Sequence, residues 1–193
     1  MQKTLILDID DSCILCADPL QAFIERAIHQ TAISPLRDHL EISRSFNVTE
    51  AQADQLVEDF WYSKEFANLP ADPSAKIVLP NLHREGYSLI GITACGSDPQ
   101  IIQSRHSNLL EVFGFNFKAI HCVGLRGDKS IVLRSYPPSI WVEDHWLNAM
   151  RGHEAGHRTF LLDRPYNQLG TWTGIRRVQN WHDIQRIISE ESG

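Results

Sequence analysis

Acidic, hydroxyl and amine side chains stand after four predicted strands, at the points where those strands end. Asp8 and Asp10 follow the first strand, Thr93 the second, Lys129 the third, and Glu143 with Asp144 the fourth. Because ligands of open α/β sheets bind at the carboxyl ends of the strands, we expect these side chains to meet. Crowded carboxylates are costly unless a cation or a lysine offsets their charge. The set therefore predicts a ligand site rather than a folding requirement.

Four motifs carry a resemblance to a known family. The segment Asp8-Ile9-Asp10-Asp11-Ser12 resembles the DxDx(T/V/S) motif of the haloacid dehalogenase-like superfamily. Thr93 is similar to its second motif, Lys129 to its third, and Glu143-Asp144 to its paired acidic fourth. Their order, spacing and strand-end context all match, and together they span most of the chain. The resemblance implies a Rossmann-like α/β fold, a doubly wound parallel sheet with a small helical cap inserted after the first strand.

The chemistry implied by this resemblance is Mg²⁺-dependent hydrolysis of a phosphomonoester. Asp8 would attack phosphorus and form an aspartyl-phosphate, which divides one difficult step into two. Asp10 would protonate the leaving oxygen and later deprotonate the attacking water. This second acid favours a phosphatase, because dehalogenases of the superfamily lack it. The oxygen ligands of Mg²⁺ would come from Asp8, the backbone carbonyl of Asp10, and Asp144.

The remaining motif residues would bind the phosphoryl group or support the ligands. Thr93 and the backbone amide of Ala94 are expected to bind phosphoryl oxygens, while Lys129 neutralises charge near the nucleophile. We prefer Lys129 to Arg126 because Lys129 lies in the predicted loop-to-helix segment. Glu143 is expected to orient a ligand or a metal-bound water, the alternative being a solvated neighbour of the fourth-motif aspartate.

Three local segments resemble the 5′(3′)-deoxyribonucleotidase group of the superfamily. They are Cys16-Ala17-Asp18 leading into Phe23, the cap aromatics Phe60-Trp61 with Phe66, and the turn Asp163-Arg164-Pro165-Tyr166-Asn167. Those enzymes place cap aromatics against the base, and aromatic faces stack on any base. A (deoxy)nucleoside monophosphate is therefore the favoured substrate, with a sugar phosphate or another small phosphorylated metabolite as the alternative. Phe60 and Trp61 could equally pack into a core.

Two positions depart from the family pattern. Relatives commonly have Gly in place of Asp11, and Val or Thr in place of Ser12. The absence of glycine is expected to change the turn after the nucleophile and to shift substrate preference. An Asp11 carboxylate that points inward would also repel an anionic substrate.

Two rival functions come from other classes. The segment His153-Glu154-Ala155-Gly156-His157 spells HExxH, the zinc-peptidase signature. However, Gly156 suits helix termination and a strand over 159–162 begins almost at once, so we interpret the match as coincidental. The other rival is a non-catalytic binding module that retains the fold.

Strand and helix alternate along the chain except between residues 12 and 75. Strands are predicted over 5–7, 87–93, 117–121, 139–142, 159–162 and 176–178, and helices over 17–30, 36–66, 72–82, 98–112, 146–154 and 182–189. Alternation of this kind implies a parallel sheet. Residues 1–12 and 76–193 are therefore expected to form the α/β core, and 13–75 the helical cap.

Composition sets broad limits on the 193-residue chain. Hydrophobic residues make up 42% of it and the net charge is −6, which argues against nucleic acid as a partner but permits a small anion. No apolar run is long enough to cross a bilayer, and the N-terminus does not resemble a signal peptide. Four scattered cysteines, Cys13, Cys16, Cys95 and Cys122, indicate free thiols and a cytoplasmic location. The sequence is compatible with an oligomer.

Overall fold

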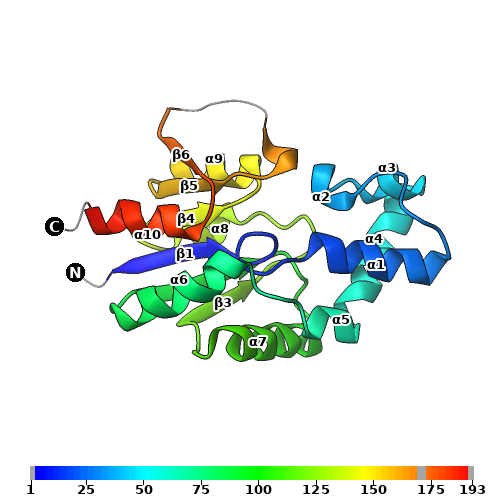
Figure 1. Cartoon of the computed structure of the whole chain (residues 1–193), viewed down its shortest axis with the longest axis horizontal. Coiled ribbons are helices and arrows are strands. Elements are labelled where there is room, and N and C mark those ends of the chain that lie inside the picture. Colours follow the sequence, from blue (N-terminus) through cyan, green and yellow to red (C-terminus); the bar gives the residue numbers. More distant parts are fainter. Residues whose placement is uncertain (1–2, 169–172, 191–193) are drawn as a thin grey trace.

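A six-stranded, all-parallel sheet forms the centre of the molecule (Figure 1). The computed structural model describes residues 3–168 and 173–190. The strands are β1 (Thr4–Asp8), β2 (Ser88–Thr93), β3 (Ala119–Cys122), β4 (Ile140–Glu143), β5 (Arg158–Leu162) and β6 (Ile175–Val178). They lie in the order β3-β2-β1-β4-β5-β6. The predicted Rossmann-like parallel sheet is therefore confirmed.

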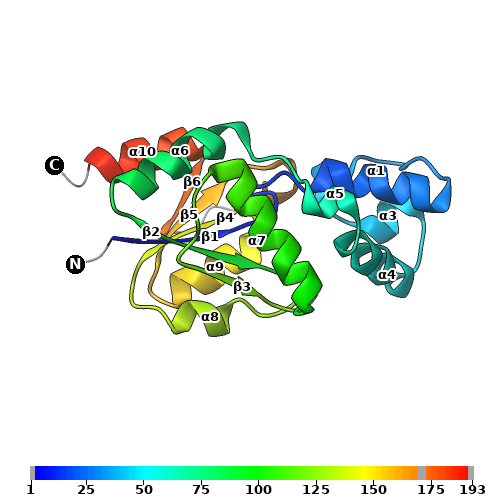
Figure 2. The same cartoon turned by 90° about the horizontal axis from the view of Figure 1, so that it is seen from below.

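Helices cover both faces of the sheet (Figure 2). They are α6 (Pro73–Arg84), α7 (Pro99–Phe113), α8 (Ser130–Arg134), α9 (Trp146–Glu154) and α10 (Trp181–Glu190). Since successive side chains of a strand point to opposite faces, Leu5 and Leu7 join a core cluster with α6, α7 and α10. Ile6 instead joins a cluster with Leu133 of α8 and with Trp141. Burial on both faces explains why β1 is a continuous apolar run.

The strand order decides which polar residues meet. The neighbours of β1 are β2 on one side and β4 on the other, with Asp8 beside Ile92 and Leu7 beside Val142. The residues that end these three strands therefore lie at one edge, although they are far apart in the sequence. Lys129 reaches the same edge because it directly precedes α8.

Five helices gather at one end of the molecule, beside the carboxyl ends of the strands (Figures 1 and 2). They are α1 (Ala17–Ile28), α2 (Leu36–His39), α3 (Ile42–Phe46), α4 (Glu50–Trp61) and α5 (Lys64–Ala67). They have a small core cluster of their own, which includes Ile24, Leu36 and Phe46. We call this group the cap. The predicted boundaries of the cap, at residues 13 and 75, stay a prediction. Helix α6, which packs on α10 of the core, begins at Pro73.

The predicted helical stretch over 36–66 is four separate helices. Leu40 and Asn47 adopt left-handed backbone conformations, with φ of 57° and 52°, and these end α2 and α3. Thr49 then begins α4 through a capping box with Gln52. In the described part of the chain, no helix combines the length and the apolar character that crossing a membrane requires.

Candidate active site

A pocket of about 470 Å³ lies where the cap faces the carboxyl edge of the sheet. Six of the seven residues predicted for catalytic, metal-binding, phosphate-binding or orienting roles in the core line this pocket, namely Asp8, Asp10, Ala94, Lys129, Glu143 and Asp144. Apolar cap residues form the opposite wall, among them Leu20, Leu40 and Val57. The strand-end residues are thus brought together as expected, except for Thr93, which is buried and outside the pocket lining.

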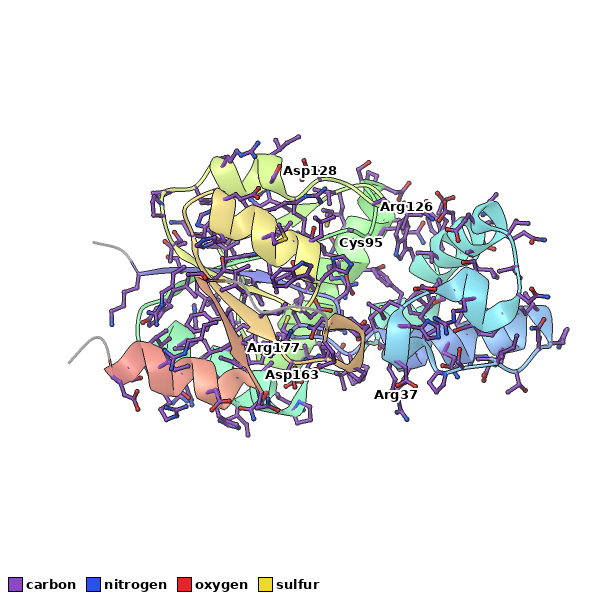
Figure 3. The ribbon with its side chains drawn as sticks, turned by 90° about the horizontal axis from the view of Figure 1, so that it is seen from above. Arg37, Cys95, Arg126, Asp128, Asp163 and Arg177 are labelled. Atoms are coloured by element: carbon purple, nitrogen blue, oxygen red, sulfur yellow. The ribbon has the colours of Figure 1, made fainter. Side chains whose placement is uncertain are left out.

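Lys129 is the cation next to Asp8. Its Nζ donates to Asp8 Oδ1 at 2.6 Å and to Glu143 Oε2 at 3.2 Å, and all three side chains are buried. Arg126 instead donates to Glu50 Oε2 and Asp54 Oδ1 of the cap, both at 2.8 Å, and is exposed. Figure 3 shows Arg126 on the side of the core that faces the cap. The geometry therefore fits the preference for Lys129 over Arg126.

Three carboxylates could hold a divalent cation. Asp8, Glu143 and Asp144 are buried, and one oxygen from each lies within 4.8 Å of the others. One lysine cannot neutralise three carboxylates, and hard oxygen donors are the ligands that Mg²⁺ prefers. The donor set therefore fits the predicted ion. Glu143 Oε1 also accepts a hydrogen bond from the backbone amide of His145 at 3.0 Å. This second contact suits the orienting role predicted for Glu143.

Burial and mutual repulsion perturb these carboxyl groups. Burial raises the pKa of Asp8 well above its usual value, and Glu143 adds to the effect while Lys129 opposes it. Burial also raises the pKa of Glu143 to about 7. For Asp144, burial again raises the pKa, but hydrogen bonds, including one from Tyr166, outweigh it and leave the pKa below its usual value. The raised pKa values of Asp8 and Glu143 show that ionising these carboxyl groups together is unfavourable in the metal-free protein, a cost that a divalent cation would offset.

Asp144 is held by residues that the sequence did not connect with it. Ser12 Oγ donates to its Oδ1 at 2.9 Å, and the Tyr166 hydroxyl donates to its Oδ2. Asn167 Nδ2 donates to its backbone carbonyl at 2.6 Å. Tyr166 and Asn167 belong to a short 3₁₀ turn, η1 (Pro165–Asn167), that follows β5. The late turn singled out for its resemblance to nucleotidases thus orients a candidate metal ligand.

Neighbouring ion pairs fix that turn. Asp163, just before it, accepts from Arg177 Nη1 of β6 at 2.7 Å, a pair visible in Figure 3. Arg177 also donates to the side-chain and backbone oxygens of Asn167, at 2.6 and 2.7 Å. The resemblance located this segment, but only the tertiary contacts explain what it does.

The side chain of Asp10 is held at both carboxylate oxygens. Thr93 Oγ1 donates to Oδ2 at 2.6 Å, and Arg105 Nη2 of α7 donates to Oδ1 at 2.5 Å. In this arrangement the Thr93 hydroxyl contacts the candidate proton donor, whereas its predicted contact with a phosphoryl oxygen stays a prediction. Arg105 was not foreseen, because no motif in the sequence singles out one arginine within a helix.

Asp11 has a left-handed backbone conformation in the turn that follows Asp8. Its φ of 54° is left-handed, the region that glycine favours. Its carboxylate accepts from the amides of Cys16 and Ala17 at 2.8 and 3.1 Å, and Arg164 donates to its carbonyl at 3.0 and 2.9 Å. Burial, followed by repulsion from Asp144, raises the pKa of Asp11 to about 7. Local hydrogen bonds thus hold Asp11 in a conformation that glycine adopts more readily.

The two cap aromatics are mostly core residues. Phe60 is 1% exposed and packs edge-on against Phe23 and Phe66, with ring centroids 5.4 and 5.8 Å away. Trp61 is 8% exposed, and its ring lies so close to Gly96 that a Cβ there would be 3.2 Å away. Both line the pocket, so stacking on a substrate stays a prediction for them.

The HExxH segment does not form a zinc site. His157 is buried; its Nδ1 accepts from the Ser139 amide at 3.1 Å and its Nε2 donates to the Leu133 carbonyl at 2.9 Å. Both ring nitrogens of one neutral tautomer are therefore used in the core. Helix α9 ends at Glu154, and Gly156 has a φ of +88°, so the helical spacing that the motif needs is lost. Packing explains this histidine fully.

Known proteins share this fold. No protein-family model matches the sequence. The structure of L-2-haloacid dehalogenase from Xanthobacter autotrophicus with covalently bound chloropropionic acid is 12% identical, with a TM-score of 0.62 over 98% of this chain and 99% of that one. D,D-heptose 1,7-bisphosphate phosphatase from B. bronchiseptica, complexed with magnesium and phosphate, is 14% identical, with a TM-score of 0.57 over 98% and 99%. These likenesses show that the chain has the α/β fold of these haloacid dehalogenase and phosphatase structures, which agrees with the fold that the resemblance in the sequence implied.

The amino-acid sequence is also similar to that of a named protein. The chain is 26% identical over 196 aligned positions to a protein of Halalkalibacterium halodurans named "Putative nucleotidase BH1399". The alignment covers 98% of this chain and 94% of that protein.

Proposed function

We propose that this protein is a Mg²⁺-dependent phosphomonoester hydrolase that acts through an aspartyl-phosphate on Asp8. The observation that carries the proposal is the buried cluster of Asp8, Lys129, Glu143 and Asp144 at the floor of the pocket. Grouping three carboxylates around a single lysine destabilises a fold unless a cation completes the site. The phosphatase and nucleotidase names among the similar proteins support the same reaction class.

The chain's own residues supply the nucleophile and the proton transfers. An oxygen of Asp8 forms a bond to phosphorus while the bond from phosphorus to the leaving oxygen breaks, and Asp10 gives its proton to that oxygen. Asp10 then takes a proton from water, which attacks phosphorus and releases phosphate from Asp8. Lys129 stays beside the nucleophile at 2.6 Å and offsets charge on the phosphoryl group.

The metal would be held by Asp8 and Asp144, with the backbone carbonyl of Asp10 as a further ligand. When bound, Mg²⁺ offsets the negative charges of nucleophile and substrate and aligns the phosphoryl group. Tyr166 and Ser12 would fix the orientation of Asp144, because each donates a hydrogen bond to one of its carboxylate oxygens.

A (deoxy)nucleoside monophosphate is the substrate we favour. The pocket extends from the carboxylates to an apolar wall of the cap, which suits a leaving group with a flat, weakly polar part. The nucleotidase name of the relative supports this choice. A sugar phosphate is the alternative, since the cap aromatics expose little of their surface. Four free thiols are consistent with action in the cytoplasm.

Hydrolysis of p-nitrophenyl phosphate and of nucleoside monophosphates, with Mg²⁺ or with EDTA, tests the reaction class. We expect turnover with Mg²⁺ only, and its loss in Asp8→Asn. Asp18→Asn is the matched control, because Asp18 is an exposed carboxylate on α1 with a side chain 63% accessible. Turnover by Asp8→Asn, or no turnover of any phosphomonoester by the native protein, would refute the proposal.

Trp61→Ala tests the substrate. If Trp61 contacts a base, the variant should raise KM for nucleotides more than KM for p-nitrophenyl phosphate, which has no base. Equal increases for both would favour the sugar phosphate alternative, and a panel of phosphorylated metabolites would then rank the candidates.

A further inference from the structure

Arg105 is a completely buried arginine beside the candidate proton donor. It lies on α7 with 0% of its surface exposed, and its Nη2 is 2.5 Å from Asp10 Oδ1. The two residues are 95 positions apart in the sequence. No residue of the proposed reaction other than Asp10 is paired with it in the described part of the chain.

Folding needs do not account for an arginine at this position. Its Nε and Nη1 atoms are buried and have no hydrogen-bond partner among residues 3–168 and 173–190. Each unpaired buried N–H group costs about 1–3 kcal/mol, and a well-packed apolar side chain of similar size is often the more stable choice. The role of this arginine therefore lies at the ion pair that it forms among the described residues, with the carboxylate of Asp10.

The contacts around Asp10 show what Arg105 can do there. With Arg105 on Oδ1 and Thr93 on Oδ2, the carboxylate plane cannot rotate freely. Proton transfer requires the acid to lie within hydrogen-bond reach of the leaving oxygen, in a suitable direction. A carboxylate held at both oxygens before substrate binds has lost most of its rotational freedom in advance.

The cap contributes to this arrangement. The Arg105 guanidinium lies over the ring of Phe66, with Cζ 4.3 Å from the ring centroid. Phe66 belongs to α5 of the cap and is itself 1% exposed. A planar guanidinium stacks on an aromatic face in a way that a lysine ammonium does not. The cap thus holds the arginine, and the arginine holds the acid.

We propose that Arg105 is a positioning residue that fixes the carboxylate of Asp10 for proton transfer, and that Phe66 holds its guanidinium in place. This inference rests on the proposed function, because it requires Asp10 to exchange a proton with the leaving group. It adds a buried cation of α7 and an aromatic residue of the cap to the catalytic arrangement.

Leaving-group dependence tests the role. Alkyl leaving groups such as a ribose hydroxyl need the proton during departure, whereas p-nitrophenolate departs without it. We therefore expect Arg105→Lys to lower kcat for an alkyl phosphate by about 10–100-fold, within the range of general acid catalysis. The change in kcat for p-nitrophenyl phosphate should stay below about threefold, and KM for both should stay within about twofold because Arg105 does not line the pocket.

A double-mutant cycle with Asp10→Asn separates positioning from a structural role. If Arg105 acts through Asp10, Arg105→Lys should have little further effect in the Asp10→Asn background. An equal loss in both backgrounds, or an unchanged alkyl-phosphate kcat in the single variant, would overturn the inference. Arg26→Lys, an exposed arginine paired with Glu65 on the cap, is the control and should leave kcat unchanged.

Phe66→Leu is the second test variant, used if circular dichroism shows that Arg105→Lys does not fold. It should lower the alkyl-phosphate kcat several-fold with little effect on p-nitrophenyl phosphate, and unchanged kcat for both would overturn the inference. A native protein inactive on both substrates would instead refute the proposed function itself, so the two failures are distinguishable.

Discussion

Two cations in the same loop provide a matched test of the site. Lys129 has a side chain 5% exposed, and its partners Asp8 and Glu143 are 7% and 0% exposed. Arg126, close by in the sequence, is 62% exposed and pairs with two cap carboxylates. The perturbation is to replace each with Met, which removes the charge and keeps most of the length.

The expected magnitudes differ because of burial. Removing one partner of a buried ion pair costs about 3–5 kcal/mol, since the other charge is left without compensation. Removing an exposed pair costs about 0–1 kcal/mol, because water replaces the partner. Lys129→Met should therefore lower the free energy of unfolding by about 3–5 kcal/mol and Arg126→Met by less than about 1 kcal/mol.

Urea unfolding in EDTA, and again with excess Mg²⁺, measures both values. The deficit of Lys129→Met should shrink with Mg²⁺, because a divalent cation offsets the carboxylates that the lysine left behind. Turnover of p-nitrophenyl phosphate should fall at least about 100-fold in Lys129→Met and change little in Arg126→Met.

Equal destabilisation by the two substitutions would refute this reasoning. So would a deficit in Lys129→Met that Mg²⁺ leaves unchanged, because the carboxylates would then not share one cation site.

Two further predictions concern neighbouring residues. Because the folded-state pKa of Asp11 is about 7 against an ordinary 3.8, its bound proton stabilises the fold fully below pH 4, and this stability is lost as the pH rises to 7. Asp11→Asn keeps an oxygen that accepts from the amides of Cys16 and Ala17 but does not ionise. In EDTA at pH 8, its free energy of unfolding should therefore exceed that of the native protein by about 1–3 kcal/mol. A stability difference between variant and native protein that is no larger at pH 8 than at pH 5 would contradict this. Tyr166→Phe removes the hydroxyl that donates to Asp144, and calorimetric titration should show Mg²⁺ binding about 10-fold more weakly; unchanged affinity would count against Asp144 as a ligand.

Many of the strands and helices could be predicted because they depend on residues that are neighbours in the sequence. The buried strand over 5–7 and the helix over 146–154 each follow from neighbouring residues, the first from an apolar run and the second from a helical segment closed by Gly156. Thr49 likewise begins its helix through a capping box that is complete within four residues. The prediction of one helix over 36–66 failed where Leu40, an exposed residue, adopts a left-handed backbone conformation and ends α2.

The candidate site divides in the same way. Asp8, Lys129, Glu143 and Asp144 could be predicted, because each ends a strand or begins a helix and the parallel order brings those ends to one edge. The HExxH segment shows the limit of spacing alone, because the hydrogen bonds of His157 in the core exclude it as a ligand.

By itself, the sequence determined the order of the six strands along the chain and the chemistry-bearing residue types at their ends, since both depend on residues close together in the chain. Only the tertiary structure decided that Arg105 and Thr93 hold Asp10, and that Tyr166 and Ser12 hold Asp144. Such contacts join residues 22 to 132 positions apart, and they depend on how helices pack against the sheet and the cap, which no local pattern encodes. Side-chain orientation at the site is therefore a property of packing.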